Sequence, residues 1–128
     1  MTVEKDRVAM TLSKDAILAV KDIREPTRVE VPEWGGVVFV KEMTGRERES
    51  FETYAASKVK DGKMDLSGLR ISLLLVTLVD DNGHRIFDPE DTESLNSKSG
   101  TVLARLGVVA QELNGLGAAV PEEMRKNS

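Results

Sequence analysis

The sequence is marked first by the residue types that it lacks. It contains no cysteine, which excludes a disulfide framework, a thiolate metal site and a cysteine nucleophile. Its one histidine, His84, has no second histidine or cysteine with which to form a zinc site. Aromatic residues make up only 4% of the chain, so the core must be built mainly from Leu, Val, Ile and Ala. We therefore expect neither a metal nor a cofactor.

Long apolar stretches are also missing. The longest apolar run, Leu73–Val76, lies in a segment over residues 66–79 that also holds Arg70. A membrane-spanning helix needs about 20 apolar residues, so this segment is predicted to be a buried helix. Residues 1–10 alternate charged and apolar groups and show no apolar stretch typical of a secretory signal. We expect a cytoplasmic protein with no membrane partner.

The charge pattern favours a solvated surface over a nucleic-acid interface. The formal net charge is −4, and basic residues are interleaved with acidic ones, as in Arg46–Glu49. A duplex DNA reader usually carries a basic face, and the sequence shows no Lys/Arg cluster. We expect no nucleic-acid partner, although a small helical DNA-binding regulator stays open as an alternative.

Two β-rich runs surround a Pro/Gly cluster in the first third of the chain. Val29–Val31 alternates apolar and polar side chains, and Val37–Val40 follows a break that includes Pro32. This pattern predicts a β-hairpin. Gly35 and Gly36 are expected to supply the positive φ angles of its turn.

Helical periodicity and start signals cover most of the remaining chain. Four predicted helices begin after capping residues: Ser13 before residues 14–21, Thr44 of a Thr44/Glu47 capping box, Asp65 before residues 66–79, and Asp88 before Pro89. A stripe of Phe51, Tyr54, Ala55 and Val59 predicts that the second of these helices runs to Gly62.

The last long helix has the clearest amphipathic pattern. Its apolar face consists of Val102, Leu106, Val109 and Leu113, it is capped by Asn96 or Ser97, and Asn114-Gly115 is expected to stop it. We predict a mainly α fold with a small N-terminal β-hairpin and helices packed around a central buried helix over residues 66–79. Residues 12–116 are expected to form a single globular domain between a flexible N-terminus, 1–11, and a flexible C-terminal tail, 117–128.

Catalytic constellations are incomplete throughout the sequence. His84 lies in a turn, and Asp80-Asp81-Asn82-Gly83 lacks the first acid of an EF-hand loop. We therefore predict that the protein is not an enzyme and works by binding other proteins. Trp34 is either a cap on the helical core or a binding anchor, because tryptophan is enriched among interface hot spots. The predicted partner-binding residues are Trp34, Gly35, Gly36, Phe39, Leu106, Leu113 and Leu116, which would place a groove beside the last long helix with Trp34 at its border.

The order of these segments resembles the small tail assembly chaperones of long-tailed (siphovirus) bacteriophages. The stretches that carry the resemblance are Leu12–Leu18, Val29–Gly36 with its V-P-E-W-G-G, Met43–Arg48 with its T-G-R-E-R, Leu78–Gly83 with Phe87 and Asp88, and Leu106–Leu116. The resemblance covers roughly residues 12–117.

The resemblance implies a function that composition does not. Such proteins bind the long, helical tape measure protein, keep it soluble and are thought to recruit tail tube protein during virion assembly in the infected bacterium, and they are absent from the mature virion. The implied partners are the tape measure protein, the tail tube protein, a longer frameshifted form of the chain, and the chain itself in a low oligomer. A permanent tail component, such as a tail terminator or connector subunit, is the second alternative.

Overall fold

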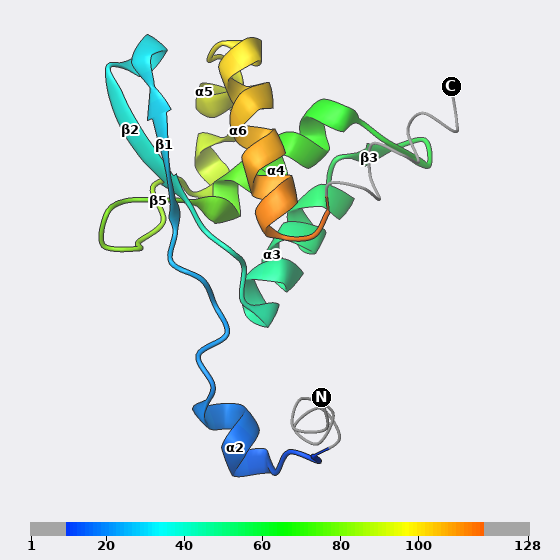
Figure 1. Ribbon diagram of the computed structural model, residues 1–128. Helices are drawn as coiled ribbons and strands as arrows, with labels where there is room; N and C mark the ends of the chain where they lie inside the picture. The colour runs from blue at the N-terminus through cyan, green and yellow to red at the C-terminus, as the bar shows by residue number, and fades with distance from the viewer. Residues whose placement is uncertain (1–9, 117–128) are drawn as a thin grey trace, which may run out of the picture.

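A computed structural model describes residues 10–116 of the chain (Figure 1). The predicted flexible tail, 117–128, and nearly all of the predicted flexible N-terminus, 1–11, lie outside this range. The first element is a short helix, α2 (Lys14–Ala19), whose Ser13 cap accepts a hydrogen bond from the Ala16 amide as predicted. It ends two residues before the predicted Lys21, and it stands apart from the other elements (Figure 1).

A three-stranded antiparallel sheet is built on the predicted hairpin. Strands β1 (Thr27–Val31) and β2 (Gly36–Val40) pair in register from Thr27 opposite Val40 to Val31 opposite Gly36. A third strand, β5 (Leu78–Val79), pairs with the end of β2, so that the sheet order is β1-β2-β5. β2 is therefore the central strand of this sheet.

The prediction of a mainly α fold is wrong, because the described part of the chain is a mixed α/β structure. Residues 66–79 were expected to form one helix, but α4 (Leu66–Thr77) ends two residues early and the chain turns directly into β5. The cause is tertiary: Phe39 and Val40 of β2 offer free backbone groups to Leu78 and Val79. A continuous apolar run is compatible with both a buried helix and a buried strand, so its periodicity could not separate the two.

Helix α3 (Gly45–Ala56) begins at the predicted capping box. The Thr44 hydroxyl accepts from the Glu47 amide at 3.2 Å, and the Glu47 carboxylate accepts from the Thr44 amide at 2.9 Å. The helix ends before Val59, contrary to the predicted stripe, and a small hairpin of β3 (Val59–Lys60) and β4 (Lys63–Met64) follows. Asp61 and Gly62 both have positive φ, as the tight turn of such a hairpin requires.

Helix α4 is the most buried element, and it packs against α3, α5 and α6. Its residues Ile71 and Leu73–Val76 are at most 2% exposed. Ser72 and Thr77 are buried with them, but each hydroxyl donates to the carbonyl four residues earlier, at 2.8 and 2.9 Å. These local bonds let polar side chains lie in an apolar core without unsatisfied groups.

The remaining helices close the core on the other side of α4. A 3-10 turn, η2 (Pro89–Asp91), leads into α5 (Thr92–Asn96), which bears the buried Leu95. Helix α6 (Gly100–Leu113) follows, capped by Ser99 and not by the predicted Asn96 or Ser97. Figure 1 shows α5 and α6 beside the far end of the β1–β2 hairpin and α2 at the opposite end of the molecule.

Candidate partner-binding surface

The connection between β1 and β2 presents Trp34 at the tip of the hairpin. Pro32 begins a 3-10 turn, η1 (Pro32–Trp34), since its ring fixes φ near the value that this turn needs. Gly35 then adopts φ 78°, and its amide donates to the Pro32 carbonyl at 3.0 Å. Gly36 is already the first residue of β2 and has no positive φ. A positive φ was predicted for both Gly35 and Gly36, and in the structure only Gly35 adopts it.

An ion pair ties this tip to α6. The two terminal guanidinium nitrogens of Arg105, Nη1 and Nη2, donate to the Glu33 carboxylate at 3.0 and 2.8 Å. These hydrogen bonds, followed by a backbone hydrogen bond within Glu33, lower the pKa of the Glu33 carboxyl to about 2. A two-pronged contact of this kind fixes direction as well as distance, so it holds the residue next to Trp34 in one orientation relative to α6.

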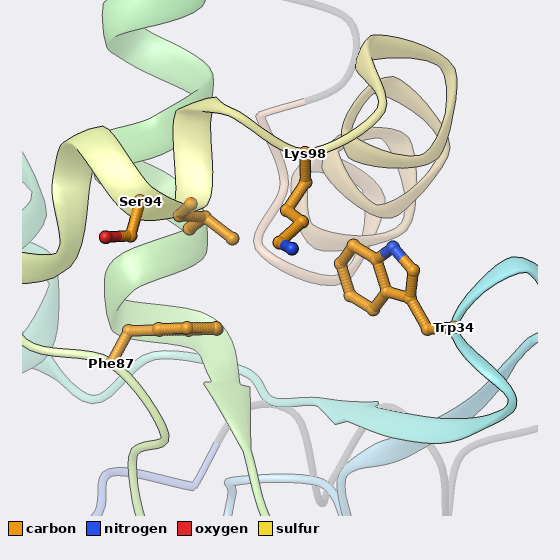
Figure 2. Close-up of a pocket in the computed structure, with 5 residues that line it drawn as sticks. Trp34, Phe87, Ser94 and Lys98 are labelled. Carbon is orange, nitrogen blue, oxygen red and sulfur yellow. The ribbon is translucent and has the colours of Figure 1, made fainter.

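Trp34 borders a pocket of about 400 Å³, which we name the Trp34 pocket. Its lining consists of Trp34, Phe87, Ser94, Leu95 and Lys98. Figure 2 shows Trp34 on one side and Phe87 with α5 on the other, and the Lys98 side chain reaches into the space between them. Trp34 and Phe87 are half-buried against the core, while Leu95 is only 2% exposed.

The Trp34 pocket combines an apolar wall with a single cationic group. Its volume lies within the range of about 300–1,000 Å³ that is typical of ligand pockets. Trp34, Phe87 and Leu95 offer apolar and aromatic surface, and Lys98 belongs to no ion pair within residues 10–116. Such a site suits an apolar side chain that has an acidic group nearby.

The structure brings few of the predicted site residues together. Gly35 and Gly36 flank Trp34 in the hairpin, and Phe39 is half-buried on β2, opposite Arg28 and Val79. The apolar face of α6 lies in the core, where Leu106 is fully buried and Leu113 packs against the core cluster; Leu116, three residues after the end of α6, is 8% exposed. None of these three leucines lines the Trp34 pocket, which α5 forms in place of α6.

Sequence reasoning missed four residues of this pocket, which are Phe87, Ser94, Leu95 and Lys98. Phe87 lies in an irregular segment, Leu95 near the end of a five-residue helix, and Lys98 in the loop before α6. Phe87 belongs to the stretches that carry the family resemblance, but none of the four positions carries a motif that predicts a pocket. They become neighbours of Trp34 only because α5 packs against α4 and the hairpin tip is held against α6.

A second apolar surface lies on residues 10–23, which we name the N-terminal arm. Its helix α2 has no buried residue. The large apolar side chains that it exposes are Met10, Leu12, Ile17, Leu18, Val20 and Ile23. Exposed apolar groups concentrated in one segment mark an interaction surface more often than groups scattered singly do.

The base of the N-terminal arm is fixed by Arg24. Its guanidinium donates to the Leu113 carbonyl at 2.7 Å and to the Glu42 carboxylate at 3.1 Å, and its amide donates to the same carboxylate at 3.2 Å. The backbone and side-chain bonds from Arg24 lower the pKa of Glu42. Arg24 thus holds the chain at the C-terminal end of α6, and the arm projects beyond it (Figure 1).

Other kinds of site find little support in the part of the chain that the structure describes. A further pocket of about 350 Å³ between β3, α4 and α5 is mainly polar. Residues 10–116 contain no group of three or more His, Cys, Asp or Glu side chains placed to hold a metal ion. His84 and Asp80 belong to the predicted turn, where the Asp80 carboxylate accepts from the Asn82 and His84 amides. Over the same range, no helix is long and apolar enough to cross a membrane.

Among solved structures, the fold is similar to that of the tail assembly chaperone of bacteriophage HK97. The two share 22% sequence identity with a TM-score of 0.54, over 88% of this chain and 95% of the other. At this identity the match establishes a common fold. No significant match is found among curated protein sequences.

The family follows from the sequence as a whole. A family model described as phage tail assembly chaperone matches residues 12–127, which is nearly the entire chain. The protein therefore belongs to the phage tail assembly chaperone family, and the resemblance inferred from its sequence is confirmed. It acts in bacteriophage tail assembly through protein partners.

Proposed function

We propose that the chain binds the tape measure protein of its phage, keeps it soluble and helps to recruit tail tube protein around it. This would take place in the cytoplasm of the infected bacterium, and the chain would be missing from the mature virion. Membership of the chaperone family supports the general role. The Trp34 pocket is the observation that supports a binding site for an apolar partner segment.

The pocket fits one apolar face of a partner helix. Helix-in-groove recognition uses a few side chains at i, i+3, i+4 and i+7 that enter an apolar depression. Trp34 and Phe87 offer aromatic walls at the surface, with Leu95 buried behind them. Lys98 would select segments that carry an acidic residue beside the apolar anchor.

Co-expression with the tape measure protein tests this proposal. We expect the tape measure protein to stay soluble and to co-purify with the wild-type chain. Trp34→Ala should reduce both, as should Lys98→Glu, which changes an exposed side chain and leaves the core intact. Lys63→Glu is the matched control, because it makes the same charge reversal at an exposed position outside the pocket.

Two results would contradict the proposal. One is a tape measure protein that aggregates equally with and without the chain. The other is detection of the chain in purified virions by mass spectrometry, which would favour a permanent tail component. If binding survives both pocket variants, the chaperone role stands and its surface lies elsewhere.

A further inference from the structure

We propose that the N-terminal arm of one copy docks its apolar face into the Trp34 pocket of a second copy. The arm is the largest concentration of exposed apolar side chains in the part of the chain that the structure describes. Leu18 is 73% exposed and Ile17 54% exposed, although both lie on a formed helix. Self-association through these residues is distinct from binding a tape measure protein, and the protein alone suffices to test it.

The helix of the arm needs an external surface to be stable. α2 has only six residues, and isolated helices shorter than about 12–15 residues are marginal in water. Its Ser13 cap supplies one hydrogen bond, but none of its side chains is buried. Docking would supply the apolar contacts that the domain itself does not provide.

The Trp34 pocket of the same copy is out of reach. Arg24 is tied to Glu42 and Leu113, at the end of the hairpin opposite Trp34. The four residues between α2 and Arg24 extend at most about 14 Å, and Leu18, one residue before the end of α2, adds only a few ångströms, about 1.5 Å per helical residue, to that reach. The path from Arg24 along β1 to the hairpin tip is longer, roughly 23 Å. Figure 1 likewise shows the arm and the tip at opposite ends of the molecule.

The arm and the pocket are complementary in chemistry. The pocket offers apolar walls and the ammonium group of Lys98, which has no carboxylate partner within residues 10–116. On α2, Asp15 lies one turn before Leu18 and therefore on the same side of the helix. If Leu18 enters the pocket, Asp15 comes to its border, where Lys98 lies.

Docking of the arm would also affect the binding of the tape measure protein. This point alone rests on the proposed function. An arm in the pocket covers the apolar surface that a tape measure segment would use. Self-association and partner binding would then compete for Trp34, and the partner would have to displace the arm. The pocket would stay protected from unspecific contacts until the partner is made.

Light scattering of the purified full chain at increasing concentration tests the docking. We expect the wild type to exceed its monomer mass of 14.1 kDa. Leu18→Glu in the arm and Trp34→Ala in the pocket should each weaken association by at least about tenfold, because each removes a large apolar contact. Lys98→Glu should weaken it without disturbing the core, while Lys63→Glu should associate like the wild type.

Mixing the defective variants gives the sharpest test. Leu18→Glu keeps an intact pocket, and Trp34→Ala, or Lys98→Glu if the former does not fold, keeps an intact arm. Each alone should be monomeric, whereas an equal mixture should form a heterodimer of about twice the monomer mass. If two arms instead paired with each other, Leu18→Glu would stay monomeric in every mixture and the pocket variants would associate normally, which would overturn the proposal.

A wild type that remains monomeric at about 1 mM would also overturn the docking proposal, because its dissociation constant would then be weaker than about 1 mM. Tape measure solubility with the arm variant Leu18→Glu separates this result from the proposed function. Failure of self-association with normal solubilisation leaves the chaperone role intact. Normal self-association without solubilisation leaves the docking intact.

Discussion

The Asn114 side chain connects α6 with the segment between β2 and α3, and its replacement by alanine should destabilise the fold. Its side-chain oxygen accepts from the Met43 amide at 2.7 Å, and its side-chain nitrogen donates to the Ala110 and Lys41 carbonyls at 2.9 and 3.3 Å. Alanine leaves the Met43 amide without this acceptor in a partly buried place. We expect a loss of about 2–3 kcal/mol, since an unsatisfied buried donor costs about 1–3 kcal/mol and each further bond contributes about 1.

Urea denaturation followed by circular dichroism measures this loss. With a slope of about 1–3 kcal/mol per molar urea for a small domain, the midpoint should fall by about 0.7–3 M. Glu112→Ala is the matched control, because Glu112 is exposed on the same helix and its side chain forms no hydrogen bond among residues 10–116. A change for Asn114→Ala no larger than that of the control would refute the claim that this side chain joins α6 to the segment between β2 and α3.

Three further variants test the core, helix α6 and the Glu33–Arg105 ion pair. Leu106→Ala should lower the free energy of unfolding in urea by about 2–5 kcal/mol, because Leu106 is fully buried. A decrease under about 0.5 kcal/mol is typical of a surface position and would contradict this burial. Gly107→Ala should stabilise the domain by about 0.5 kcal/mol, since alanine favours a helix by up to about 1 and the new Cβ meets only the flexible Arg70 side chain, at 3.2 Å; a loss above about 1 kcal/mol would show that Arg70 cannot move. In an NMR titration, the Glu33 carboxyl should titrate at about pH 2 in the wild type and near its ordinary pKa of 4.5 in Arg105→Ala. Because the folded pKa is depressed, its stabilisation is complete above pH 4.5 and is lost as the pH falls toward 2; equal midpoints in the two proteins would refute the ion pair.

Local signals in the sequence were reliable at the beginning of three helices, α2, α3 and α4. The caps at Ser13, Thr44 and Asp65 all receive the expected backbone hydrogen bonds. A cap depends on residues within one turn of it, so it can be read without knowing the fold. The β1–β2 hairpin was predicted for the same reason, because its two strands are neighbours in sequence.

The errors arose where a distant segment or an overlooked turn intervened. Leu78 and Val79 leave their helix because β2 supplies pairing partners some forty residues away in sequence. At Val59 the apolar stripe predicts a longer helix, but Asp61-Gly62 is a strong hairpin signal, and the chain forms the β3–β4 hairpin there. Ser99 caps α6 in place of two other plausible residues nearby.

The predicted site residues show the same difference between local signals and tertiary packing. A lone tryptophan at a hairpin tip indicates Trp34, which does border the pocket, whereas Leu106 and Leu113 of α6 and the following Leu116 lie in or against the core. An amphipathic stripe shows that a helix face is covered, and it does not show whether the cover is the chain's own core or a partner. Only the packing of α4 against α6 decides this.

By itself the sequence determined the family, the starts of α2, α3 and α4, the hairpin and the lack of cysteine chemistry, because each depends on residues that are close in the chain or on composition. The tertiary structure decided the third strand, the walls of the Trp34 pocket and the isolation of the N-terminal arm. These features depend on which distant segments meet. That choice is made by the burial of α4 and by long-range bonds such as those of Arg24, Arg105 and Asn114.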